Sequence, residues 1–381
     1  MPYPAAGFTR CHHPRSHTML DRLAPACLVV ALLSPAAASA GDEAAVQVAV
    51  TKASAFLATQ QAEDGSFAAD IGPAVTGLAL AALVRSGTPV DADMVQNGLE
   101  SLLSFRQPDG GIYTPGSPVA NYETSIAMLA LAACNADGRL DAEVADAVAF
   151  VKRLQWDESE ERDQADAFYG GAGYGRHERP DLSNTAFMVE ALRSVGESEN
   201  DPAIQRALVF VSRTQNLPGP NNPLPYPAKN PDGGFYYTPA NGGESQAGTT
   251  PNGGLRSYAS MTYAGLKSMI FAGVAKDDPR VVAASDWLRK HYSFEENPGM
   301  GQAGLFYYYH TASKALSVLG EDPFLDAAGK PHDWRGELTA ALLARQQEDG
   351  SWINANDRWM EGKPVLTTSY ALLALANCMA P

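Results

Sequence analysis

Apolar and polar residues along this chain follow a two-helix pattern that recurs six times. The first helix of each unit has apolar residues at helical spacing on one side only, whereas the second is apolar on nearly all sides, as in 77–83 and 125–133. A helix that is apolar all round is typically buried. The pattern predicts first helices over these ranges: 44–61, 92–107, 141–155, 202–215, 279–292 and 334–347.

The second helices share a register that is set by a threonine. It occurs once in each unit, at Thr76, Thr124, Thr185, Thr262, Thr311 and Thr368. A large apolar residue follows seven positions later, and a small residue comes directly before it. A small residue beside a large one at a fixed position indicates close contact between neighbouring helices. We therefore expect six inner helices packed side by side, with the first helices outside them.

A short turn with a recurring pattern connects several of these helices. A glutamine is followed by a glycine four residues later and by an aromatic residue six residues later, in 61–67, 107–113 and 346–352. The glutamine can bond free groups at a helix end, and the glycine permits a tight turn. The last unit is as apolar as the middle ones, whereas an open array of repeats needs polar end units. We therefore expect the six pairs to close into a ring.

This Gln-x-x-x-Gly-x-aromatic pattern resembles the QW-type repeat of squalene cyclases and of the β subunits of protein prenyltransferases. The resemblance covers residues 41–381 and implies an all-α, single-domain α/α toroid with an inner and an outer ring. It also implies an isoprenoid or another apolar ligand in a central cavity. The chain lacks the Asp-x-Asp-Asp motif of the cyclases and a recognisable prenyltransferase zinc site. We therefore predict no metal and no cofactor.

Residues 1–40 are expected to be a signal peptide. Arginines precede the apolar run 23–33, and Ala38-Ser39-Ala40 has the small residues of a cleavage site. The run is too short to span a bilayer comfortably. We expect a secreted or periplasmic protein without a stable membrane span after cleavage, and Met19 is an alternative start.

Composition narrows the range of partners. The chain is 45% hydrophobic and 19% charged, so its 381 residues can bury a large core. The formal net charge of −15 argues against nucleic acid as a partner. The expected partner is a small-molecule or glycan ligand.

Three long connections, 156–180, 216–256 and 293–303, lie at the end of the ring where the inner helices begin. Long insertions on one face of a repeat scaffold commonly carry function. Polar residues of the inner helices gather at the same end. The candidate catalytic residues are Glu123, Asp181 and His310. The candidate ligand-binding residues are Asn184, Tyr258, Tyr263, Tyr307, Tyr308, Lys314, Arg256 and Trp359.

Several of these polar residues also have a structural interpretation. Asp181 and Asn184 can cap the third inner helix, His310 can be a core histidine, and Glu190 can pair with Lys267. Three functions therefore stay open. A dry, aromatic cavity would favour an apolar ligand, and paired carboxylates in a wet groove would favour a carbohydrate-active enzyme (a polysaccharide lyase or hydrolase). A filled centre would favour a non-catalytic scaffold.

Overall fold

The computed structural model describes residues 40–379 apart from residue 177. The expected signal peptide therefore lies outside the described residues, except for its last residue. The outer helices are α1 (Ala40–Gln60), α3 (Asp93–Leu103), α5 (Asp141–Arg153), α7 (Pro202–Arg213), α9 (Pro279–Lys290) and α11 (Trp334–Leu343). The inner helices are α2 (Pro73–Arg85), α4 (Ala120–Cys134), α6 (Leu182–Ser194), α8 (Ala259–Phe271), α10 (Leu305–Leu319) and α12 (Pro364–Met379).

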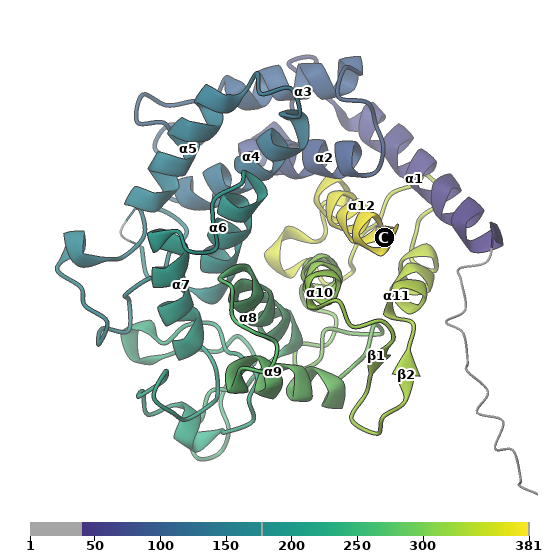
Figure 1. The fold of residues 1–381 in the computed structure, drawn as a ribbon. Helices are drawn as coiled ribbons and strands as arrows, with labels where there is room; N and C mark the ends of the chain where they lie inside the picture. Colours follow the sequence, from purple (N-terminus) through teal and green to yellow (C-terminus); the bar gives the residue numbers. More distant parts are fainter. Residues whose placement is uncertain (1–39, 177, 380–381) are drawn as a thin grey trace, which may run out of the picture. The chain divides into compact units, whose positions relative to one another are not determined.

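The twelve helices form a closed α/α toroid, as predicted (Figure 1). Each inner helix contacts the next, and α12 returns to contact α2. The outer helix α1 also contacts α11 and α12, so the first and last pairs meet. A two-stranded hairpin, β1 (Phe324–Leu325) with β2 (Pro331–His332), lies between α10 and α11.

The register threonine fixes each inner helix to the turn before it. In five units its hydroxyl oxygen accepts the N–H of the residue two positions after the turn glycine. These N–H groups belong to Phe67, Ile112, Ala172, Phe235 and Trp352, at 2.9–3.1 Å from the oxygen. A buried backbone donor needs such a partner, which explains the threonine at this position.

The turn glutamine links neighbouring units. The Gln61 amide donates to the Gly65 carbonyl of its own turn and to the Met94 carbonyl of the next outer helix, both at 2.9 Å. Gln155 and Gln215 make the same pair of bonds. Gln346 donates to the carbonyls of Gly350 and of Ala49 in α1. The last turn is thereby bonded to the first helix.

The predicted alignment of the second turn is wrong by one residue. Ile112, rather than Tyr113, bonds the register threonine, and Gly110 has the positive φ of 89°. Arg106 pairs with Ile112 as Gln61 pairs with Phe67, so Arg106 takes the glutamine position. The sequence Gln107-Pro108-Asp109-Gly110-Gly111 offers two glycines, and only the first lies at the turn.

The fifth inner helix is also offset by one residue. Thr311 does not bond the preceding turn. The predicted register expects Val318 as the large buried residue of this helix, but Val318 is half-buried and Leu319 is buried instead. Ala312 therefore takes the threonine position in α10. The shift turns His310 and Lys314 toward the ring axis, where His310 meets aromatic rings of α6 and α12.

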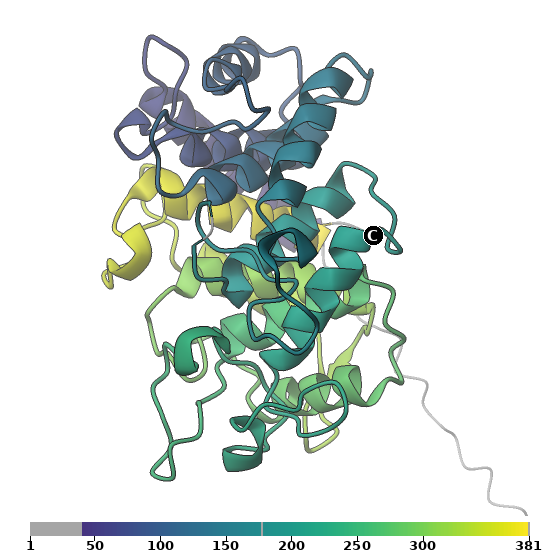
Figure 2. The same ribbon diagram turned by 90° about the vertical axis from the view of Figure 1, so that its left-hand side faces the viewer.

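The connections between outer and inner helices lie at one end of the ring, and Figure 2 shows the ring from the side. They contain short 3-10 helices: η1 (Ala69–Ile71), η2 (Glu158–Glu160), η3 (Pro227–Lys229), η4 (Ala240–Gly242) and η5 (Arg358–Met360). The thiols Cys134 and Cys378 are both free. Among the described residues, every helix is too short or too polar to cross a membrane.

Candidate functional site

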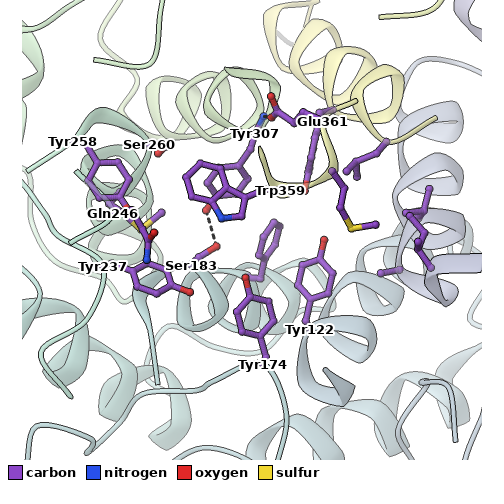
Figure 3. A pocket seen from close by; sticks show the side chains of 18 residues that line it. Tyr122, Tyr174, Ser183, Tyr237, Gln246, Tyr258, Ser260, Tyr307, Trp359 and Glu361 are labelled. Carbon is purple, nitrogen blue, oxygen red and sulfur yellow. Dashed lines mark hydrogen bonds between the residues drawn. The ribbon is translucent and has the colours of Figure 1, made fainter. Parts of the chain in front are cut away.

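A cavity of about 360 Å³ lies inside the ring at the N-terminal ends of the inner helices (Figure 3). Most of its lining is apolar. Eight aromatic side chains line it: Tyr122, Tyr174, Phe187, Tyr237, Tyr258, Tyr307, Trp359 and Tyr370. The polar lining residues are Ser183, Gln246, Ser260 and Glu361.

The register of the inner helices decides which side chains reach the cavity. In five of them, the residue two positions before the threonine lines it: Ala74, Tyr122, Ser183, Ser260 and Leu366. Phe187 and Tyr370, two positions after their threonines, lie one turn deeper and line it as well. Residues four apart share a helix face, so these two positions form the axial face of the inner ring.

Two loops meet over the mouth of the cavity. Trp359 and Met360 have positive φ values of 58° and 67°, and each is 42% exposed although it lines the cavity. The Arg358 guanidinium stacks on the Trp359 ring at 4.3 Å and donates to the Gln246 side-chain oxygen at 2.7 Å. This contact joins the loop before α12 to the long connection before α8.

Glu361 fastens the first of these loops to an inner helix. Its carboxylate accepts the backbone N–H of Tyr307 at 2.8 Å and the side-chain N–H of Asn354 at 2.7 Å. The free N–H groups and the dipole of the α10 N-terminus favour a negative charge there. Burial nevertheless raises the pKa of Glu361. This carboxylate therefore has a structural role at the cavity wall.

Asp181 caps α6 behind the cavity wall. Its two oxygens accept the backbone and side-chain N–H groups of Asn184, at 2.9 and 2.8 Å. Burial raises the pKa of Asp181 to about 6, although hydrogen bonds from Asn184 and the Tyr237 hydroxyl oppose the shift. A carboxyl group with this pKa can hold or release a proton near neutral pH. Tyr237 lies between this acid and the cavity space.

Glu123 is also buried behind the wall. One carboxylate oxygen accepts from the Thr114 hydroxyl at 3.2 Å, and the other has no partner among the described residues. Burial raises the pKa of Glu123. Gly72 packs directly on this group, since an added Cβ would lie 2.3 Å from the carboxylate. Glu123 therefore does not line the cavity.

His310 and Lys314 lie deeper along the axis. The His310 ring stacks with Phe187 and Tyr370, with centroids 6.4 and 5.6 Å away, and neither nitrogen bonds a described residue. Burial lowers the pKa of His310 to about 3 and lowers that of Lys314. The histidine is therefore neutral at pH 7.

The predicted ion pair between Glu190 and Lys267 is present and buried. Burial favours the neutral form of Glu190, but the charge of Lys267 outweighs it and lowers the pKa of the carboxyl group.

The remaining candidates fall into three places. Tyr258, Tyr307 and Trp359 line the cavity, and the Tyr307 hydroxyl lies 3.0 Å from the Ser183 hydroxyl. Tyr263 and Tyr308 are buried against each other, with centroids 5.8 Å apart. Arg256 lines a separate cavity. The binding roles of all these residues stay predictions.

The prediction missed most of the lining residues, among them the aromatic side chains Tyr122, Tyr174, Phe187, Tyr237 and Tyr370. The axial register identifies Tyr122 and Tyr370, whereas nothing in the local sequence marks the loop residues. The part of the chain that the structure describes holds no group of three or more His, Cys, Asp or Glu side chains able to bind a metal.

Comparison with known proteins decides which toroids this one resembles. Residues 70–237 match the family model of the squalene-hopene cyclase C-terminal domain. The type II terpene cyclase MstE from Scytonema superposes with a TM-score of 0.51 at 14% identity, over 87% of this chain and 97% of MstE. The protein has an α/α-toroid fold like that of the terpenoid cyclases.

Other solved structures share this fold. An MstE variant bound to its substrate, geranylgeranyl dihydroxybenzoate, has a TM-score of 0.53 at 14% identity, over 89% of the toroid and 98% of the variant. A glycosidase variant with bound glucose has a TM-score of 0.52 at 12% identity, over 90% and 99% of the two chains. No curated protein sequence matches the toroid. Identities this low indicate a shared fold and leave the reaction open.

Proposed function

We propose that the toroid binds an isoprenoid, or another apolar molecule, in its central cavity. The observation that carries this proposal is the lining, with eight aromatic side chains and further aliphatic and methionine side chains. Burial of apolar ligand surface contributes roughly 25 cal/mol per Å². The complex of MstE with geranylgeranyl dihydroxybenzoate supports an isoprenoid as the ligand class.

A few polar groups would orient such a ligand. The Ser183 and Tyr307 hydroxyls form one hydrogen-bonding pair in the wall, and Gln246 lies at the mouth. Apolar pockets commonly use a small number of polar groups in this way. Aromatic faces also stabilise a positive charge in a bound molecule. A proton from Asp181 would reach the cavity through the hydroxyl of Tyr237. Asp181 therefore stays the candidate acid for any transformation of the ligand.

The carbohydrate-active alternative has less support in the central cavity. Glycosidases usually place two carboxyl groups at one bond. Among the described lining residues, Glu361 is the only carboxylate, and both of its oxygens accept hydrogen bonds from the protein. Glu123 and Asp181 lie behind the wall. The open cavity also argues against a scaffold with a filled centre.

We further propose that the toroid is exported to the periplasm or the medium. The charged start, the apolar run 23–33 and the small residues at 38–40 support a cleaved signal peptide. N-terminal sequencing of protein secreted by its own host would test the cleavage position.

Ligand binding can be tested with farnesol and geranylgeraniol as probes. Binding of either probe should change the tryptophan fluorescence of the mature protein, because Trp359 lies at the mouth of the cavity. The variant Ala74→Phe puts a ring into the cavity and should abolish this change. Ala45→Phe, on the exposed side of α1, is the matched control and should bind normally. Equal binding by both variants, or no binding by the wild type, would overturn the proposal.

A further inference from the structure

A second cavity, of about 270 Å³, lies between the long connection before α8 and helix α9. It is separate from the central cavity, although the two share a wall. Tyr258 lines the central cavity while its neighbour Ser257 lines the second one, and Gln246 and Ala247 divide in the same way. The polar residues of the second cavity that matter here are Asn230, Asp232, Arg256, Ser257, Trp287 and His291.

One wall of this cavity is aromatic. The rings of Trp287 and His291 stack with centroids 4.0 Å apart and an angle of 23° between their planes. Trp287 is 5% exposed, so its ring is almost fully packed. The His291 Nδ1–H donates to the Trp287 carbonyl at 2.8 Å, which leaves Nε2 of a neutral ring as a free acceptor. The wall thus offers an acceptor beside a flat apolar surface.

The opposite side is polar and held in place. The Asp232 carboxylate accepts from the Ser257 hydroxyl at 2.6 Å and from the backbone N–H of Gly234 at 3.1 Å. The Asn230 amide donates to the same carboxylate at 3.2 Å and to the Leu255 carbonyl at 2.9 Å. These bonds fix the directions of the groups before any ligand arrives, which lowers the entropic cost of binding.

The charges of the lining balance. Asp232 contributes one negative charge and Arg256 one positive charge, and both side chains are exposed. An anion would be opposed by the carboxylate and a cation by the guanidinium. An apolar molecule would cover both groups without bonding them, which is costly. A neutral ligand with several donors and acceptors fits this lining best.

We propose that the second cavity binds a neutral sugar, one monosaccharide unit at a time. A sugar ring has a C–H face that packs on an aromatic surface and hydroxyls that both donate and accept hydrogen bonds. Asp232 and Asn230 would bond adjacent hydroxyls, the Trp287 and His291 pair would cover the C–H face, and Arg256 would close the rim. This site does not depend on the ligand of the central cavity.

Saturation-transfer NMR of the mature protein with D-glucose, D-galactose, D-mannose and N-acetylglucosamine tests the site. At least one sugar should bind, and both Asp232→Asn and Arg256→Ala should weaken binding at least about tenfold, the effect of losing roughly one good hydrogen bond. The melting temperature of each variant shows whether it is folded, and Arg256 is exposed enough to be replaced without unfolding.

The variant Ala74→Phe, which fills the central cavity, is the control and should bind the sugar as the wild type does. The proposal is wrong if none of the four sugars binds. It is also wrong if binding survives both site variants, or if Ala74→Phe alone abolishes it. The last result would place the sugar in the central cavity.

Discussion

The bond between the last turn and the first helix makes ring closure open to a direct test. The Gln346 amide donates to the Ala49 carbonyl at 2.9 Å and to the Gly350 carbonyl at 3.0 Å. Gln346→Ala removes both donors and leaves two carbonyls without this partner. Gln346 lies three residues after the end of α11, and alanine keeps its Cβ, so the substitution leaves the helix itself intact.

The expected loss follows from the bonds that are removed. An intramolecular hydrogen bond contributes about 1 kcal/mol net, and an acceptor left unpaired in a half-buried place adds to the loss. Gln346→Ala should therefore lower the free energy of unfolding by about 2–3 kcal/mol. Gln215→Ala removes an equivalent pair of bonds, to Gly233 and Arg280, in the middle of the chain. Gln215→Ala should lower the free energy of unfolding by a similar amount.

The two variants should differ in where the structure loosens. Amide hydrogen exchange should accelerate along α1 in Gln346→Ala, because α1 is attached to the ring through its contacts with α11 and α12. In Gln215→Ala the exchange of α1 should stay normal. Gln60→Ala, at an exposed glutamine bonded only to Thr59, should change stability by less than about 0.5 kcal/mol. If α1 exchanges at the wild-type rate in Gln346→Ala, this bond does not hold the ring closed.

Two further predictions concern the last turn and the buried acid. Gly350→Val should lower the free energy of unfolding, measured by chemical denaturation, by at least about 2 kcal/mol. Gly350 has a φ of 92°, and an added Cβ would lie 2.4 Å from the Lys52 carbonyl. Gly87→Val, with a φ of 99° and open space around it, measures the backbone effect alone, and an equal loss in both would refute the collision. Burial raises the pKa of Asp181 from 3.8 to about 6, so its contribution to stability is present below pH 4 and is lost as the pH rises to 6. Relative to Asp181→Asn, the wild type should lose about 3 kcal/mol of unfolding free energy over that range. A difference that does not change with pH would contradict the shifted pKa.

The sequence predicts the fold because every level of the pattern agrees. Each inner helix is recognised in the sequence by a threonine, a small residue and a large apolar residue at fixed spacing. In five units of the structure the threonine bonds the preceding turn, and the small and large residues are packed in the core. The two register errors occur where one of the recurring residues is missing or occurs twice. The turn after α3 has Arg106 in place of glutamine and two adjacent glycines, and the turn before α10 has no glutamine.

The cavity was harder to predict than the ring. The candidates Glu123 and Asn184 lie one position before the threonine, whereas five inner helices line the cavity from two positions before it. One residue turns a helix by about 100°, so this difference moves a side chain from the axis to the wall. Glu123 and Asn184 are buried in the wall for that reason. Tyr174 and Tyr237 come from irregular connections, whose path no periodic pattern specifies.

The offset of α10 explains why His310 and Lys314 turn to the axis. With Ala312 in the threonine position, they occupy the two places that Ser183 and Phe187 occupy in α6. His310 contacts the aromatic rings that form the cavity floor, and Lys314 lies below it, where Glu190 and Lys267 form their ion pair. The charged groups of the axis therefore lie in a layer beneath the cavity, and Phe187 and Tyr370 separate them from it. The cavity lining therefore stays mostly apolar, and a mostly apolar cavity accommodates an apolar ligand best.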